Sequence, residues 1–228
     1  MVARNSVRTL MSIVLLLSVS TGQAGDEVDQ PQWIDEYGLQ VSITATEVTV
    51  AQYRSCVAAG LCEEQTVAER CNYGKVGFDD HPVNCVSHFG AEQYCAAVGG
   101  RLCSETEWLE ACRGTDNRRF PYGDAFNLET CNSRSTTATI EGRDGTVPAG
   151  SLERCEGGVR GLMDMAGNVA EWLADCKGDY CKFRGGGHLS NDPIEYFAGC
   201  RGVCSGNQKT LQSGTVGIRC CRDLTSAP

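Results

Sequence analysis

The order of apolar and polar positions predicts short strands and three helices in the first half of the chain. Residues 39–49 (LQVSITATEVT) are rich in β-branched side chains with rough alternation, which predicts a strand. Residues 50–59 have helical spacing and are followed by Gly60, whereas residues 90–98 have the same spacing and precede a Gly pair. Residues 104–112 begin with Ser104-Glu105-Thr106-Glu107, a capping box that predicts the third helix.

The second half of the chain has few periodic stretches. Residues 113–215 are rich in Gly, Asn, Asp, Ser and Thr, which predicts loops and short strands. Residues 216–222 (VGIRCCR) predict a closing strand, and residues 25–38 are an acidic linker or an edge segment. The expected organisation is therefore one loop-rich α+β domain over 39–223 with a tail at 224–228.

The N-terminal segment predicts export. Arg4 and Arg8 precede a short apolar run at residues 10–19, and small residues before a cut after Ala24 complete a signal peptide at 1–24. The alternative is a membrane anchor, but the run is shorter than the roughly 20 residues that span a bilayer. We therefore expect a periplasmic or secreted protein without a transmembrane anchor after cleavage.

Charge and cysteine content narrow the class of protein. Removing the signal peptide takes away two arginines and changes the formal net charge from −9 to −11, which argues against nucleic acid and anionic membranes as partners. Fifteen cysteines in an exported chain predict a disulfide framework. A zinc site is the alternative, but no C-x-x-C pair occurs, and His81, His88 and His188 lack zinc spacing.

Seven segments in order carry distinctive motifs: residues 47–57 (EVTVAQYRSCV), 81–95 (HPVNCVS and AEQYC within it), 100–108 (GRLCSETEW), 120–124 (FPYGD), 161–172 (GLMDMAGNVAEW), 184–187 (RGGG) and 217–220 (GIRC). Together they resemble the formylglycine-generating (sulfatase-modifying factor) family over nearly the whole exported chain. The resemblance implies a variant of the C-type lectin fold.

The resemblance also implies structural calcium. In related enzymes, the stretch corresponding to residues 164–171 binds calcium, here through the side chains of Asp164 and Glu171 and the carbonyls of Gly167 and Val169. A second family site corresponds, more loosely, to four further positions: Asn132, Ser133, Asp144 and Thr146. The alternative is that Asn168 and Glu171 only cap turns.

Two disulfides follow from the resemblance, Cys95 with Cys220 and Cys112 with Cys200. Two further local bridges are expected from proximity in sequence. They are Cys176 with Cys181 around Gly178-Asp179, and Cys56 with Cys62 around Gly60. Because fifteen is odd, one thiol is left over, and Cys204 and Cys221 are the candidates.

The family's oxidase chemistry needs two thiols that hold copper(I), six and eleven residues after the Arg of its R-G-G-S motif. Counting from Arg184 places Ser190 and Glu195 at these positions, and neither replaces a thiolate at copper(I). We therefore assign no catalytic residue and expect no copper. His188 stands near these positions; we expect it to be solvated, with lining of a pocket as the alternative.

Three hypotheses remain from the sequence. The first is a non-catalytic binding or interaction module for an unidentified protein, peptide or glycan, with its binding face around residues 190–196. The second is a copper-dependent formylglycine-generating oxidase with rearranged thiols, acting on a sulfatase cysteine. The third is a disulfide-rich structural secreted protein without a discrete ligand.

Overall fold

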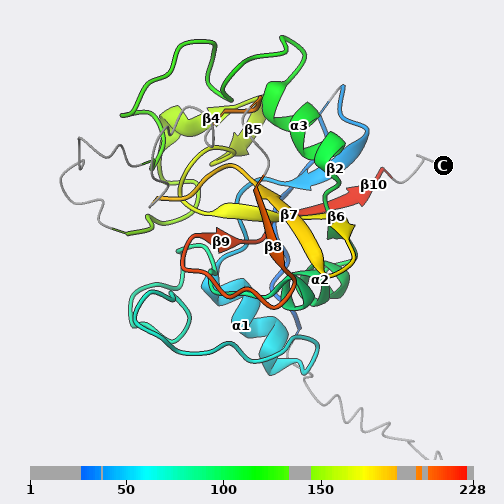
Figure 1. The fold of residues 1–228 in the computed structure, drawn as a ribbon, viewed down its shortest axis with the longest axis vertical. Coiled ribbons are helices and arrows are strands. Elements are labelled where there is room, and N and C mark those ends of the chain that lie inside the picture. Colours follow the sequence, from blue (N-terminus) through cyan, green and yellow to red (C-terminus); the bar gives the residue numbers. More distant parts are fainter. Residues whose placement is uncertain (1–26, 37, 134–144, 189–198, 202–204, 225–228) are drawn as a thin grey trace, which may run out of the picture.

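The computed structural model describes residues 27–36, 38–133, 145–188, 199–201 and 205–224. Within these residues the chain forms a mixed α and β structure of two four-stranded sheets, one two-stranded sheet and three α-helices (Figure 1). The helices are short, and long connections join the elements of the second half, as the composition predicts.

The first sheet joins the beginning of the described chain to its end. Its order is β1-β2-β10-β3, and all three pairs are antiparallel. Its strands are β1 (Trp33–Ile34), β2 (Val41–Thr44), β10 (Cys220–Asp223) and β3 (Arg101–Leu102). The edge strand β1 lies within the acidic segment 25–38.

The second sheet has the order β8-β7-β6-β9 and carries the longest hairpin among the described residues. Its strands are β8 (Ser205–Gln208), β7 (Tyr180–Arg184), β6 (Ala170–Lys177) and β9 (Val216–Gly217). Strand β9 pairs parallel to β6, whereas the other two pairs are antiparallel. The separate two-stranded sheet joins β4 (Glu156–Gly157) to β5 (Val159–Met163) and follows a short 3-10 helix (Glu153–Cys155).

The three predicted helices are present: α1 (Val50–Ala58), α2 (His88–Ala97) and α3 (Glu105–Arg113). The capping box predicted at Ser104 and Glu107 is formed. Helix α2 begins two residues earlier than predicted, because the Ser87 hydroxyl accepts a hydrogen bond from the Gly90 amide. Helix α3 lies at the opposite end of the molecule from α1 and α2 (Figure 1).

Two predicted strands are shorter than the sequence pattern indicates. The strand predicted over 39–49 is limited to β2, because Thr49 caps α1 and Glu47 turns into the interior. The closing strand predicted over 216–222 is two strands with different partners. Ile218 and Arg219 separate β9 from β10, and Arg219 is fully buried.

The described residues form three apolar cores, of which the two larger lie on either side of the strands that cross the molecule. One packs α1 and α2 through Tyr53 and Tyr94 against Trp172 of β6, and the other packs Trp108 of α3 against Leu162 and nearby apolar side chains. None of the helices in the described residues is long and apolar enough to cross a membrane.

Seven disulfides cross-link the described residues. They join Cys56–Cys62, Cys71–Cys85, Cys95–Cys220, Cys103–Cys221, Cys112–Cys200, Cys131–Cys155 and Cys176–Cys181. Both pairs that the family resemblance implies and both local pairs are among them. The proposal that Cys221 is the odd thiol is wrong, because successive β10 side chains point to opposite faces and Cys221 reaches Cys103. Cys204, the other candidate, lies outside the described residues.

Candidate functional site

A buried ion pair lies between the two cores. Arg219 donates from Nε to Glu171 Oε1 over 2.8 Å, and both side chains are essentially inaccessible to solvent. The other Glu171 oxygen accepts a hydrogen bond of 2.5 Å from Trp108 Nε1. Arg219 also donates to the carbonyl oxygens of Thr44 and Met163. This one guanidinium therefore links β2, β5 and β6.

A second buried carboxylate, Glu47, holds the loop before β6. One of its oxygens accepts from the Val169 amide over 3.0 Å, and the other accepts from Asn168 Nδ2 over 2.9 Å. Asn168 has a positive φ of 55°, a conformation that asparagine adopts more readily than most residues. Glu47 thus satisfies the buried Val169 amide and fixes the Asn168 side chain.

Asp164 is the third buried carboxylate of this cluster, and one of its oxygens has no hydrogen-bond partner. Its Oδ2 accepts a 2.6 Å hydrogen bond from the Gly150 amide, whereas Oδ1 is buried without a hydrogen-bond partner. A buried, unpaired carboxylate oxygen is costly, so it indicates a position where a cation or a water molecule binds.

The charges of this cluster are unbalanced. Burial raises the pKa of Glu47 well above its ordinary value, and the neighbouring Asp164 and Glu171 carboxylates raise it further. Burial also raises the pKa values of Asp164 and Glu171, although Arg219 opposes both shifts. Because one guanidinium faces three carboxyl groups, full ionisation of the cluster needs a further positive charge.

Asn168 links the two predicted calcium sites. Its backbone amide donates to the Asn132 carbonyl oxygen over 2.8 Å, and its side-chain Oδ1 accepts from Asn132 Nδ2 over 3.2 Å. A Cβ on Gly167 would lie 2.6 Å from Asn132 O, so only glycine allows this approach. Ser133 is buried in the same region. The structure therefore brings the two predicted sets together.

Thr146, a member of the second predicted set, is buried and its hydroxyl is already hydrogen-bonded. The Thr146 hydroxyl is engaged by Asn72 Nδ2 at 2.9 Å and His81 Nδ1 at 2.9 Å. Asp144 lies outside the described residues.

His188 is not solvated as we expected. It is buried, and both its backbone amide and its ring Nδ1 lie within 2.9 Å of the Asn168 carbonyl oxygen. The histidine therefore supports the turn that follows Gly167. The residues at the family's thiol positions, Ser190 and Glu195, lie outside the described residues, as does the rest of the expected binding face at 190–196.

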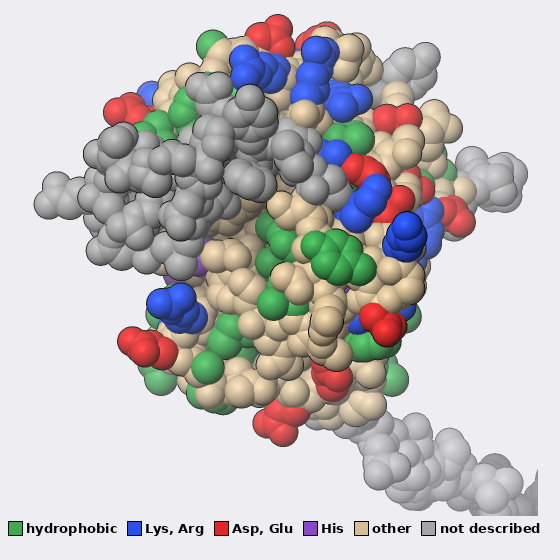
Figure 2. Space-filling view, viewed as in Figure 1, with side chains coloured by type: hydrophobic (Ala, Val, Ile, Leu, Met, Phe, Trp, Pro, Cys, Tyr) green, Lys and Arg blue, Asp and Glu red, His purple; other side chains and the backbone are tan. Residues whose placement is uncertain are grey.

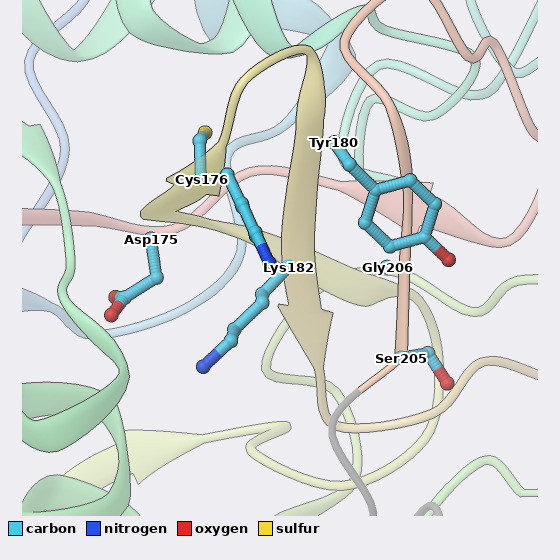
Figure 3. A pocket seen from close by; sticks show the side chains of 7 residues that line it. Asp175, Cys176, Tyr180, Lys182, Ser205 and Gly206 are labelled. Atoms are coloured by element: carbon cyan, nitrogen blue, oxygen red, sulfur yellow. The ribbon is translucent and has the colours of Figure 1, made fainter.

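A separate open cavity of about 680 Å³ lies on the β6–β7–β8 surface. Its lining comprises Asp175, Cys176, Lys177, Tyr180, Lys182, Ser205 and Gly206. In Figure 3 the Tyr180 ring lies beside β8, whereas Asp175 and the end of Lys182 lie across β7 from it. Acidic and basic side chains are interspersed over the face seen in Figure 2, so no large patch of one charge dominates it.

Sequence reasoning missed the two central residues of the buried cluster, Glu47 and Arg219. Both stand inside motifs that carry the family resemblance, Glu47 at the first position of EVT and Arg219 at the third position of GIRC. Charged residues within otherwise apolar segments are the signal that could have identified them, because such residues are buried only when paired.

Comparison with known proteins decides the family. The Sulfatase-modifying factor enzyme 1-like domain matches residues 19–224. The chain belongs to this family. Among relatives of the sulfatase-modifying factor domain, the formylglycine-generating enzyme of Streptomyces coelicolor is 30% identical over 181 residues, covering 66% of this chain and 56% of the enzyme. The serine/threonine-protein kinase pkn1 of Chlamydia caviae is 36% identical over 105 residues, covering 45% of this chain and 15% of the kinase.

The chain covers less than two thirds of the length of these curated relatives. The structure of PvdO from Pseudomonas aeruginosa has the same fold, with a TM-score of 0.63, 20% identity, and coverage of 81% of this chain and 80% of that protein. The fold is therefore the α+β, C-type lectin-like fold of the sulfatase-modifying factor family, cross-linked by disulfides.

Proposed function

We propose that this chain is an exported, non-catalytic binding or interaction module built on the sulfatase-modifying factor fold. The observation that carries the proposal is the state of the cysteines. Every cysteine among the described residues is in a disulfide, and counting along the sequence places Ser190 and Glu195 at the family's two thiol positions. A copper(I) site of the family type needs thiolates, which a serine and a carboxylate do not supply.

Disulfide content supports the extracytoplasmic part of the proposal. Seven disulfides in the described residues are typical of proteins that fold in the periplasm or outside the cell. The pattern of residues 1–24 predicts the same compartment, although this segment lies outside the described residues.

The β6–β7–β8 cavity is the described surface that best suits a ligand. Its lining offers the half-exposed ring of Tyr180 for stacking together with lysine, aspartate and serine groups for hydrogen bonds. A protein, peptide or glycan presents the mixture of apolar and polar groups that such a surface binds. The Y180A variant is expected to lose most of the affinity for any ligand held in this cavity.

Calcium has a structural role in this proposal. Asp164 Oδ1 is the buried oxygen available to the ion, and the carbonyls of Gly167 and Val169 complete the set together with Glu171. Each Glu171 oxygen accepts one hydrogen bond and retains a second lone pair. In the second set, Asn132 and Ser133 join the carbonyl of Thr146 and the carboxylate of Asp144.

The alternative function is a formylglycine-generating oxidase with rearranged thiols. It is favoured by relatives that carry the name formylglycine-generating enzyme. The third possibility, a structural secreted protein, predicts that no ligand binds to the cavity.

An oxidase assay tests the proposal directly. The oxidatively folded protein is incubated with copper(I) and a peptide containing C-x-P-x-R, and mass spectrometry measures conversion of the cysteine to formylglycine. We expect no product from the wild type, beside a working formylglycine-generating enzyme as control. The S190C/E195C variant is the matched comparison. Copper(I) binding by this variant and not by the wild type would support the assignment of residues 190 and 195 to the family's two thiol positions. Formylglycine made by the wild type would overturn the proposal.

A further inference from the structure

The Cys176–Cys181 disulfide differs from the other six in its exposure. The two cysteines stand directly opposite each other on β6 and β7 and close the hairpin at Gly178 and Asp179. Among the fourteen cysteines that the structure places in disulfides, Cys176 is exposed and the other thirteen are buried. Cys176 is therefore the most solvent-accessible of the described cysteines.

A buried histidine lies against this disulfide. His88, the first residue of α2, is 1% exposed and meets the Trp172 ring edge-on at a centroid distance of 5.5 Å. Its Nε2 lies 3.5 Å from Cys176 Sγ and 2.9 Å from the Leu173 carbonyl oxygen. The ligand atoms of His88, Cys176 and Cys181 all lie within 4.8 Å of one another.

The second ring nitrogen of His88, Nδ1, has no hydrogen-bond partner. Nδ1 is buried and forms no hydrogen bond, although Glu92 Oε2 lies 3.4 Å away, one helical turn along α2. The two ring nitrogens thus face a sulfur atom on one side and a carboxylate on the other. This order matches a carboxylate–histidine–metal arrangement, in which the carboxylate orients the imidazole and strengthens it as a ligand.

We propose that Cys176, Cys181 and His88 form a redox-controlled site that binds a thiolate-preferring metal ion such as Zn²⁺ after the disulfide is reduced. Two thiolates and one imidazole nitrogen are three zinc ligands, and the fourth tetrahedral position stays open for water or a ligand. In the oxidised protein the sulfur atoms are bonded to each other and the site is closed. The inference is independent of the proposed function.

Reduction requires two equivalents of a thiol or one dithiol. The first thiolate attacks Cys176 Sγ, the S–S bond breaks, and Cys181 leaves with the bonding electron pair as a thiolate. The second thiolate attacks the external sulfur of the mixed disulfide, which releases the Cys176 thiolate and an oxidised external disulfide. Two electrons have then passed to the cysteine pair. Cys176 is exposed and Cys181 is buried, so the reductant meets Cys176 first, although its sulfur points away from the Asp175, Tyr180 and Lys182 side chains of the cavity (Figure 3).

Metal binding also requires a change of histidine tautomer. Because a carbonyl oxygen only accepts hydrogen bonds, the 2.9 Å contact with the Leu173 carbonyl oxygen requires a proton on Nε2 in the oxidised protein. Zn²⁺ takes the Nε2 lone pair, so the ring proton moves to Nδ1, where Glu92 Oε2 is the nearest acceptor. Glu92 is therefore a positioning residue for the site rather than a ligand.

Limited reduction followed by Zn²⁺ titration tests the inference in a C204S background, which removes the cysteine outside the described residues. The protein is treated with increasing dithiol, new thiols are alkylated, and mass spectrometry identifies them. The dithiol is then removed without air, and Zn²⁺ binding is measured by competition with a chromophoric chelator. We expect Cys176 and Cys181 to be released first and one Zn²⁺ to bind per reduced chain, with none bound by the oxidised chain.

Variants separate the site from non-specific binding. C176S/C181S should abolish Zn²⁺ binding after limited reduction, whereas C56S/C62S is the matched control because it removes a local disulfide that is buried. E92Q should weaken Zn²⁺ binding about 10- to 100-fold, the usual effect of losing such a carboxylate. Because the Glu92 side chain is 53% exposed, E92Q should remain folded even if H88Q does not.

Three results would overturn the inference. One is release of a different disulfide before Cys176–Cys181. Another is equal Zn²⁺ binding by the reduced wild type and C176S/C181S. The third is unchanged affinity in E92Q, measured on protein whose near-ultraviolet circular dichroism matches the wild type.

Discussion

The C-terminal segment 216–223 and the outer part of the β6–β7 hairpin, residues 175–182, both contain disulfide-bonded cysteines, but they use them differently. In the C-terminal segment Cys220 and Cys221 are fully buried and reach partners 125 and 118 residues away. In the hairpin, Cys176 is exposed and its partner is 5 residues away.

The difference shows which disulfides stabilise the fold most. A cross-link that closes a long loop removes much more conformational freedom from the unfolded chain than one that closes a short loop. Cys220 belongs to the core of α1 and α2, whereas Cys221 belongs to the core of α3, so β10 joins both cores. The hairpin disulfide joins strands that are already paired, which leaves it free to change its redox state.

The largest expected effect comes from opening a long-range bridge. C95S/C220S should lower the free energy of unfolding by about 4–5 kcal/mol, because the closed loop is longer than 100 residues. Denaturant unfolding monitored by tryptophan fluorescence measures the change. A loss no larger than that of C176S/C181S would show that loop length does not govern this framework.

Loss of the buried guanidinium should have an effect of similar size. R219M leaves Glu171 and Glu47 without their counter-charge, and breaking a buried pair from one side costs about 3–5 kcal/mol. R222M is the control, because Arg222 is partly exposed and stacks on Trp33. Comparable melting temperatures for the two variants would contradict the importance assigned to the interior cluster.

Calcium removal should weaken the interior region and spare the hairpin. If Ca²⁺ is present at a hundredfold excess over its dissociation constant, a chelator should reduce stability by about 2.7 kcal/mol. The D164N variant should lose this response, because it changes the carboxylate with the free buried oxygen. Calorimetry with and without chelator measures it, and an unchanged melting temperature in the wild type would remove calcium from the proposal.

Opening the hairpin disulfide should cost less than opening a long-range bridge. C176S/C181S should lower the free energy of unfolding by about 2 kcal/mol, following from the short loop. The same denaturant titration compares it with C95S/C220S. Global unfolding of this variant would show that the hairpin disulfide supports the whole domain.

The smallest expected effect concerns the ion pairs between α3 and β7. Hydrogen bonds from Lys182 and Arg184 lower the pKa of Glu105 to about 2. Because the folded pKa is below the ordinary value of 4.5, this stabilisation is present above pH 4.5 and is lost as the pH falls towards 2. E105Q should cost about 0.5–1 kcal/mol near neutral pH, allowing for solvent screening.

A pH series tests the sign of this effect. The stability difference between the wild type and E105Q should shrink as the pH falls from 5 to about 3. E110Q, on the same helix but at an exposed position, is the matched control. A difference that grows at low pH would contradict the assignment.

The sequence pattern determined the local elements, because capping and helical periodicity depend on neighbouring residues. Ser104 and Glu107 predicted α3, and Gly60 predicted the end of α1, where the structure gives this glycine a φ of 73°. The seven motifs in order determined the family, since they resemble the sulfatase-modifying factor domain over residues 39–223.

Only the tertiary structure decided how distant residues combine. Glu47, Glu171 and Arg219 are more than 40 residues apart, yet they share one buried cluster, and His88 lies against a hairpin 88 residues further along the chain. The pairing of Cys221 with Cys103 joins β10 to the residue that follows β3. Such contacts arise because the two cores pack on both sides of the same strands, a condition that no local segment of sequence contains.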